Sequence, residues 1–221
     1  MIFDLDDTLF EELTFVIGGL NAVAEHASKK WDWPKHECLT ELEKIIYQQG
    51  RGKVFDTWLE LRGEFSQSRV KECVRIYRGH RPSIKLFDSA ETTLRAIPPS
   101  IPTFIVTDGN KQVQANKVSA LALWDRFTKV FITHRYGLTA AKPSTYCFEI
   151  IKNEWGFSWE QMVYIGDNPT KDFVSLKPLG MQTVRVRTGA FRDITVAPHM
   201  DAEFSIDRLE EILDLPLRAI A

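Results

Sequence analysis

The sequence has few of the features that mark nucleic-acid-binding, secreted or membrane proteins. Lys and Arg number 28 against 30 Asp and Glu, a net charge of −2, so there is no basic excess for a nucleic-acid partner. Three cysteines lie far apart and form no C-x-x-C pair, which favours reduced thiols over a disulfide framework or a zinc site. No apolar run approaches the roughly 20 residues of a membrane span, and no basic segment followed by an apolar one opens the chain. We therefore expect a cytoplasmic protein without a membrane partner.

The chain contains two regions that differ in the spacing of their apolar residues. From about residue 11 to 80, apolar residues recur at spacings of three and four, as in "HECLTELEKIIYQQG" and "KVFDTWLELRGEF", which predicts helices. From about residue 101, β-branched runs such as "TFIVT", "KVFIT", "MVYIG" and "TVRVR" alternate with helical stretches, including "TKDFVSLKPLG". This alternation predicts an α/β fold, a Rossmann-like parallel sheet flanked by helices. The expected division is residues 1–10 and 85–221 for the α/β core, with residues 11–84 as an inserted all-helical domain.

The first strand is short. Only three residues precede Asp4, whereas a core strand usually has about five or six. Either this strand is simply short, or the chain is cut from a longer polypeptide, and both readings stay open.

Three aspartates follow that strand in "FDLDDTL". A calcium loop does not fit them, because counting from Asp4 the required glycine falls on Leu9 and the bidentate glutamate on Phe15. Helix capping accounts for one aspartate or for Thr8, but not for the whole set. The stretch alone is equally consistent with structure and with function.

The second polar segment is "FIVTDGN", in which Thr107, Asp108 and Gly109 follow a strand. An ordinary helix cap would explain it. A phosphate-binding turn, in which the Thr107 hydroxyl and free backbone N–H groups hold an anion, would also explain it.

The third and fourth segments are "AAKPSTYCFEII" and "VYIGDNPTKD". Pro143 is favoured at the first position of a helix, so we expect Lys142 at a helix N-terminus, where a cation is unfavourable unless negative charge faces it. Asp167 follows another strand directly, and Asp172 comes five residues later. A solvated lysine and a capping aspartate are the simpler readings of each segment alone.

The combination of the four segments is more specific than any one of them. Ligands of open α/β sheets bind outside the carboxyl ends of the strands, where all these residues are expected. Clustered carboxylates with few nitrogen ligands suit a hard cation such as Mg²⁺. The set therefore predicts a site that handles phosphate with the help of Mg²⁺.

These residues resemble the four motifs of the haloacid dehalogenase superfamily. "FDLDDTL" is similar to the first motif, "VTDGN" to the second, "KP" at 142–143 to the third and "GDNPTKD" to the fourth, and the helical block resembles the helical (C1-type) cap of many members. One departure is Asp7, which stands where the family most often has glycine. The resemblance implies a Rossmann-like core, Mg²⁺ and phosphomonoester hydrolysis of a small phosphorylated substrate.

The resemblance also implies a role for each residue. Asp4 would be the nucleophile that forms an aspartyl-phosphate, and Asp6 the general acid and base. Asp167 would bind Mg²⁺ together with Asp4 and the backbone carbonyl of Asp6, and Asp172 would orient these groups or contact Lys142. Thr107, Asp108, Gly109 and Lys142 would hold the phosphoryl oxygens. Dehalogenases of the superfamily generally lack the carboxylate of Asp6, so its presence favours a phosphate ester.

Alternatives to hydrolysis remain at this stage. A phosphotransferase or mutase would use the same aspartyl-phosphate, and a non-catalytic module of a larger protein would keep the fold alone. A P-loop NTPase is disfavoured because the G-x-x-x-x-G-K-[ST] motif is absent. Within the helical block, Arg51 and Lys53 beside two glycines could meet an anionic substrate, although solvated loop charges are the simpler reading.

Overall fold

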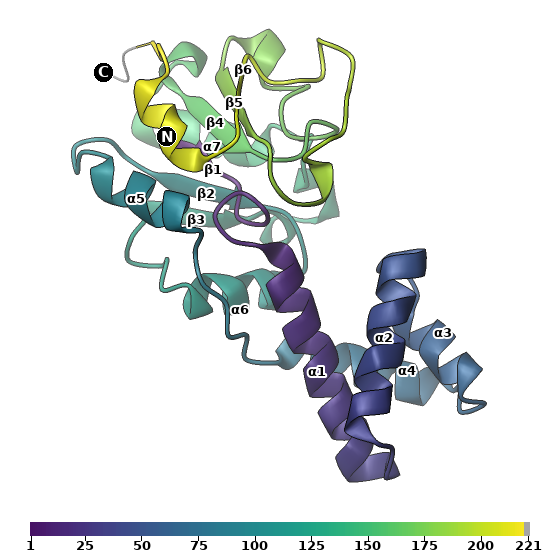
Figure 1. The fold of residues 1–221 in the computed structure, drawn as a ribbon. Helices are drawn as coiled ribbons and strands as arrows, with labels where there is room; N and C mark the ends of the chain where they lie inside the picture. The colour runs from purple at the N-terminus through teal and green to yellow at the C-terminus, as the bar shows by residue number, and fades with distance from the viewer. Residues whose placement is uncertain (219–221) are drawn as a thin grey trace. The chain divides into compact units, whose positions relative to one another are not determined.

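The computed structural model describes residues 1–218 and divides the chain into two compact units (Figure 1). Unit 1 is formed by Met1–Glu12 together with the chain from Ile84 onward, and unit 2 by Leu13–Ser83. Among the described residues, no helix combines the length and the apolar character that crossing a membrane requires.

A six-stranded sheet forms the centre of unit 1. Its strands are β1 (Ile2–Phe3), β2 (Phe104–Thr107), β3 (Lys129–Ile132), β4 (Val163–Gly166), β5 (Gln182–Val186) and β6 (Phe204–Ile206). Every neighbouring pair is parallel, in the order β3-β2-β1-β4-β5-β6. The order reverses between β1 and β4, which is where doubly wound sheets open a ligand crevice at their carboxyl ends. The predicted α/β fold with a parallel sheet is confirmed.

Helices and short 3₁₀ turns connect these strands. The α-helices are α5 (Asp88–Ala96), α6 (Lys111–Ala120) and α7 (Tyr146–Trp155). The 3₁₀ turns are η1 (Thr133–Arg135), η2 (Leu138–Ala140), η3 (Trp159–Gln161), η4 (Lys177–Leu179), η5 (Gly189–Phe191) and η6 (Leu209–Asp214). α6 begins after Asn110, whose side chain accepts hydrogen bonds from the backbone N–H groups of Gln112 and Val113.

The two faces of the sheet are buried against different helices. On one face, strand residues such as Phe104, Val106 and Tyr164 pack with Phe148 and Ile151 of α7. Because side chains alternate along a strand, Thr107 points to the opposite face, where its hydroxyl contacts Gln114 of α6. α6 therefore lies on the face away from α7, and the residues that end β2 can reach it.

Unit 2 is all-helical and has its own core. Its helices are α1 (Glu12–Trp31), α2 (Lys35–Gln49), α3 (Val54–Leu61) and α4 (Gln67–Gly79). The first residue of α1, Glu12, is the last residue of the N-terminal segment of unit 1. Leu20, Leu42 and Trp58 are among its fully buried residues. The indole N–H of Trp58 donates to Glu41 at 2.8 Å, so the one polar atom of this buried side chain has a hydrogen-bond partner.

Two local predictions are wrong. The stretch "TKDFVSLKPLG" forms turns and the short η4 instead of a helix. Pro143 is not the first residue of a helix, because α7 begins at Tyr146 and the Lys142–Pro143 peptide bond is cis. The helix α5 and the strand β6 were not predicted.

Candidate active site

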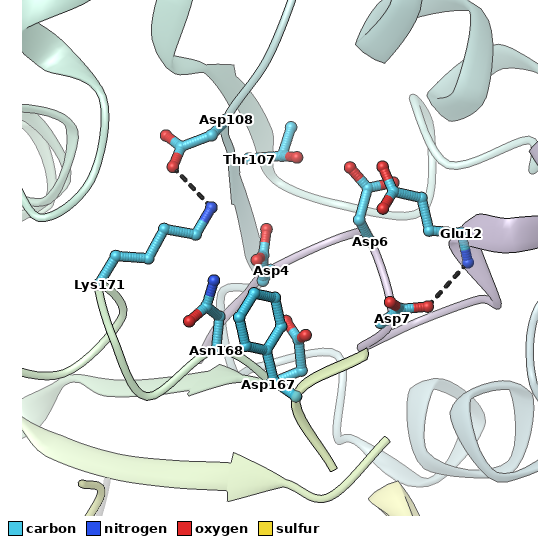
Figure 2. A pocket seen from close by; sticks show the side chains of 10 residues that line it. Asp4, Asp6, Asp7, Glu12, Thr107, Asp108, Asp167, Asn168 and Lys171 are labelled. Atoms are coloured by element: carbon cyan, nitrogen blue, oxygen red, sulfur yellow. Dashed lines mark hydrogen bonds and ion pairs between the residues drawn. The ribbon is translucent and has the colours of Figure 1, made fainter. Parts of the chain in front are cut away.

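The four predicted segments meet at the carboxyl edge of the sheet. A cavity of about 150 Å³ opens there, and Figure 2 shows its lining residues, with Asp6 and Glu12 on one side and Asp108 and Lys171 on the other. The lining residues are Asp4, Asp6, Asp7, Glu12, Thr107, Asp108, Asp167, Asn168, Lys171 and Phe191. Asp4 and Asp167 follow β1 and β4 directly, so they lie on the two sides of the point where the strand order reverses.

Lys142 is the cationic centre of the site. Its ammonium group lies 2.8 Å from Oδ2 of Asp4 and 2.8 Å from Oδ1 of Asp172, and it donates to the Tyr164 hydroxyl at 2.7 Å. Burial alone would lower the pKa of Lys142, but Asp172 and Asp4 hold that pKa well above its ordinary value. Lys142 is therefore charged and fixed between two carboxylates.

Asp4 is held by groups on both of its oxygens. The backbone N–H of Leu5 donates to Oδ1 at 2.8 Å, and Lys142 contacts Oδ2. Asp4 is 4% exposed, and burial raises its pKa to about 6 against the opposing effect of the Lys142 ammonium. The carboxylate is thus oriented by its neighbours and forms part of the cavity lining.

Asp167 completes an acidic cluster with Asp4 and Asp172. One carboxylate oxygen from each of the three residues lies within 4.8 Å of the other two. Burial, and after it the negative charges of Asp4 and Asp172, raises the pKa of Asp167 to about 9. Three carboxylates therefore share one ammonium group, and at neutral pH Asp167 keeps a proton unless a further cation replaces it. This donor set, made only of oxygen, fits a hard divalent ion.

Asp172 orients its surroundings in addition to pairing with Lys142. Its Oδ2 accepts a hydrogen bond from the backbone N–H of Asn168 at 3.0 Å. A Cβ atom on Gly166 would lie only 2.5 Å from that oxygen, so the close approach requires glycine. The glycine of the "GDNPTKD" segment therefore makes room for the second aspartate.

In the second predicted segment, the side chain of Asp108 connects three other segments of the chain. Asp108 accepts hydrogen bonds from the Thr133 hydroxyl at 2.8 Å and from the backbone N–H of Lys142 at 3.1 Å, and its other oxygen lies 3.0 Å from Nζ of Lys171. Burial alone would raise the pKa of Asp108, but Lys142 and Lys171 together hold it below its ordinary value. Gly109 has φ +130° and lies beside Gln114.

Asp6 lies beyond the end of β1 and contacts α6. Its Oδ1 is 2.7 Å from Nζ of Lys117, and its Oδ2 accepts a hydrogen bond from Nε2 of Gln114 at 2.9 Å. Burial raises the pKa of Asp6, and Lys117 opposes this rise. Asp4 and Asp6 share the cavity, as the sequence predicts, although Asp6 is outside the strand whose alternation suggested it.

Asp7 shows why the first motif most often has glycine at this position. Its φ is +52°, a conformation that glycine adopts freely and that aspartate tolerates better than most residues. Its Oδ1 accepts a hydrogen bond from the backbone N–H of Glu12 at 2.9 Å, at the start of α1. Gly189 lies so close that a Cβ atom there would be 2.2 Å from the Asp7 carboxyl carbon.

The prediction from sequence missed several residues of this site: Gln114, Lys117, Asn168 and Lys171, together with Glu12, Tyr164 and Phe191. Gln114 and Lys117 are buried polar residues three positions apart on α6, and that spacing places both on one face of the helix. A polar pair on the face that carries Val118 was the signal available in the sequence. Asn168 and Lys171 lie within the fourth segment itself.

Comparison with known proteins agrees with this geometry. Residues 1–186 match the haloacid dehalogenase-like hydrolase family, and the chain belongs to that family. It is 28% identical to a glyceraldehyde 3-phosphate phosphatase of Methanocaldococcus jannaschii, over 97% of this chain and 95% of that protein. It is 27% identical to a protein of the same name from Methanopyrus kandleri, again over 97% and 95%. The crystal structure of YfnB of Bacillus subtilis, a HAD-hydrolase bound to magnesium, superposes with a TM-score of 0.68 at 19% identity and covers 96% of each chain.

Proposed function

We propose that this chain hydrolyses phosphate monoesters of small metabolites through an aspartyl-phosphate formed on Asp4. The observation that carries the proposal is the Asp4 carboxylate, which is held by Lys142 and a backbone N–H in the lining of an acidic cavity. The family and the names of its relatives establish the enzyme class, a phosphatase of the haloacid dehalogenase-like hydrolases. The non-catalytic alternative is set aside on the same grounds.

The first half of the reaction transfers the phosphoryl group to the protein. An oxygen of Asp4 attacks phosphorus while the ester P–O bond breaks, and the leaving oxygen takes a proton from Asp6. Lys142 and the Thr107 hydroxyl stabilise the negative charge of the phosphoryl oxygens. Asp6 lines the same cavity as Asp4, which is the arrangement that this transfer requires.

The second half releases phosphate. Asp6, now ionised, takes a proton from a water molecule that attacks phosphorus, and the bond between phosphorus and Asp4 breaks. The free Asp4 carboxylate and the protonated Asp6 are thereby restored. If an alcohol replaced the water, the same site would act as a phosphotransferase. Hydrolysis yields inorganic phosphate, whereas transfer yields a new phosphate ester.

We further propose Mg²⁺ as the resident cation, bound by Asp4, Asp167 and the backbone carbonyl of Asp6, with Asp172 orienting the group. The raised pKa of Asp167 supports this, because an added cation would remove the need for its proton. When bound, the ion would offset the charge of the phosphoryl oxygens. The magnesium named for YfnB agrees with this proposal.

The size of the cavity supports a small substrate. About 150 Å³ is below the 300–1,000 Å³ that is typical of pockets for drug-sized ligands, so the site of unit 1 suits a phosphoryl group and a few further atoms. The names of the two archaeal relatives make glyceraldehyde 3-phosphate the first substrate to test. We also propose that unit 2 is the cap domain expected over residues 11–84, that the chain is cytoplasmic, consistent with its three buried free thiols, and that it has no nucleic-acid partner.

The test measures phosphate release from glyceraldehyde 3-phosphate and from a panel of phosphorylated metabolites, with Mg²⁺ and with chelator. We expect turnover that requires Mg²⁺ and that Asp4→Asn abolishes, whereas Asp125→Asn, a change of an exposed aspartate, should leave turnover unchanged. Near-normal release by Asp4→Asn would refute the nucleophile. Transfer of label to an added alcohol in place of inorganic phosphate would identify a phosphotransferase.

A further inference from the structure

The carboxyl group of Asp6 is held by two side chains that the four family motifs do not contain. Nε2 of Gln114 donates to Oδ2 at 2.9 Å, and Nζ of Lys117 lies 2.7 Å from Oδ1. Both residues belong to α6 and are almost fully buried, with 1% and 2% exposure. Each oxygen of Asp6 therefore has its own donor from the same helix.

These contacts are needed because no strand fixes Asp6. β1 ends at Phe3, and Asp6 lies in the irregular segment that leads to α1. A group that exchanges a proton with the substrate must be held within hydrogen-bond reach of one particular atom. Asp6 forms an isolated bridge with Phe10, four residues further along the same segment, which fixes its backbone but not the direction of its side chain. Side chains that contact the carboxyl group must therefore supply that precision.

Gln114 also connects Asp6 to Thr107. The same Nε2 atom donates to the Thr107 hydroxyl at 2.6 Å, so both hydrogens of the amide are used. The side chain that we propose as general acid and the hydroxyl that we propose as a phosphate ligand are thus held by one amide. A change at Gln114 disturbs their relative position without removing either group.

The burial of Lys117 has a cost that its two acidic neighbours offset. Removing an ammonium group from water costs several kcal/mol unless opposite charges lie close to it. Lys117 lies 2.7 Å from Asp6 and 3.2 Å from Oε1 of Glu12, and both carboxylates line the cavity. Packing of its aliphatic chain alone would not require the Lys117 ammonium group to lie between the carboxylates of Asp6 and Glu12.

We propose that Gln114 and Lys117 are positioning residues that hold the Asp6 carboxyl group in the orientation from which it protonates the leaving oxygen. This inference rests on the proposed phosphatase function and adds two residues of α6 to it. Neither residue touches the phosphoryl group in this scheme. Their effect passes through Asp6, and it therefore depends on how much protonation the leaving group needs.

The experiment uses the full chain with Mg²⁺ and three esters, dinitrophenyl phosphate, p-nitrophenyl phosphate and phenyl phosphate. The three phenols are progressively poorer leaving groups, and kcat/KM reports on the transfer of the phosphoryl group to the enzyme. The variants are Gln114→Leu and Lys117→Met, with Asp6→Asn as the reference for a lost acid. Lys111→Met, at an exposed lysine of the same helix, is the control.

General acid catalysis contributes roughly 10²–10⁴-fold, so a misplaced acid should lower kcat/KM for phenyl phosphate by at least about tenfold. For dinitrophenyl phosphate, which needs little protonation, the loss should stay below about threefold. Asp6→Asn should show the same dependence more strongly, and Lys111→Met should show none. A purely structural defect would lower kcat/KM by one factor for all three esters.

The possible failures are distinguishable. Equal losses for the three esters in Gln114→Leu and Lys117→Met, or no loss, would overturn this inference alone, provided that Asp6→Asn retains its dependence on the leaving group. No turnover by the unmodified protein, or no such dependence in Asp6→Asn, would overturn the proposed function as well. The two variants perturb Asp6 independently, so one that fails to fold leaves the other as the test.

Discussion

Replacing Asp167 by asparagine should stabilise the protein when no divalent cation is present. Asp167 is 4% exposed, and its pKa rises from 3.8 to about 9 because of burial and because of the charges of Asp4 and Asp172. The change keeps the shape of the side chain and removes the carboxyl group whose ionisation this site opposes. The effect should therefore be a gain in the free energy of unfolding.

The sign and size follow from the linkage between proton binding and folding. The folded-state pKa of Asp167 is raised, so stability is complete below the ordinary value of 3.8 and is lost as the pH rises toward about 9. Between pH 3.8 and pH 7 lie about three pKa units, and one unit corresponds to about 1.36 kcal/mol, so the cost at pH 7 reaches up to ~4 kcal/mol. Asparagine does not ionise and avoids this cost.

The assay is thermal or urea unfolding in the presence of chelator at several pH values. For a chain of this length, 1 kcal/mol shifts Tm by roughly 2–4 °C, so Asp167→Asn should raise Tm at pH 7 by up to about 8–16 °C. The gain should vanish near pH 4 and below, where Asp167 is protonated in the unfolded chain as well as in the folded protein. Asp125→Asn, which changes an exposed carboxylate, should leave Tm unchanged.

Adding Mg²⁺ should remove the advantage of Asp167→Asn. At about 1,000 times Kd, a ligand that binds only the folded state adds about 4.1 kcal/mol, which offsets a difference of up to ~4 kcal/mol, and only the unmodified protein should gain it. If Asp167→Asn were no more stable than the unmodified protein in chelator at pH 7, the account of three carboxylates that compete for one ammonium group would be wrong.

Three further changes test other parts of the structure. Gly166→Ala would place a Cβ atom 2.5 Å from Asp172 and should abolish most phosphatase activity, whereas Gly52→Ala, with no atom within 4 Å of the new Cβ, should be neutral in the same assay. Asp7→Gly should lower the free energy of unfolding by about 0.5–1.5 kcal/mol, the net contribution of the lost hydrogen bond from the N–H of Glu12. Asp7→Ala removes the same bond and should cost more, because its φ of +52° disfavours alanine; equal losses on urea denaturation would contradict this. Trp58→Ala should cost about 3–5 kcal/mol and show as an earlier unfolding of unit 2 by circular dichroism, because the side chain is fully buried; an unchanged transition would mean that this core does not depend on it.

The residues of the site that could be predicted from the sequence are polar residues at the carboxyl ends of recognisable strands. Asp4 and Asp167 directly follow strands and Thr107 ends one, and the carboxyl ends of parallel strands meet at one edge. The order of the strands was not predictable in the same way. The order depends on which strands pair although they lie about a hundred residues or more apart in the sequence, and no local sequence pattern indicates such pairing.

The predictions that were wrong depended on local rules that tertiary contacts override. The segment after Asp167 carries apolar residues at helical spacings, yet Asp172 must turn inward to Lys142 and to the backbone of Asn168, which a continuous helix would not allow. Lys142 was expected at a helix start because Pro143 follows it. It lies instead in the loop before α7, where its chain reaches the carboxylates.

The strand β1 has only two residues, and its pairing with both neighbouring strands still fixes the position of Asp4. β1 pairs with β2 on one side and with β4 on the other, and Ile2 and Phe3 are both buried. Immediately after it, the backbone N–H of Asp4 donates to the carbonyl of Ile165 at 2.8 Å, so Asp4 is tied to the strand that positions Asp167. The distance between these two carboxylates is therefore set by pairing between β1 and β4 and not by the length of β1. Weakening that pairing should impair the proposed cation binding and the proposed phosphoryl transfer together, because both are assigned to the same pair of strand ends.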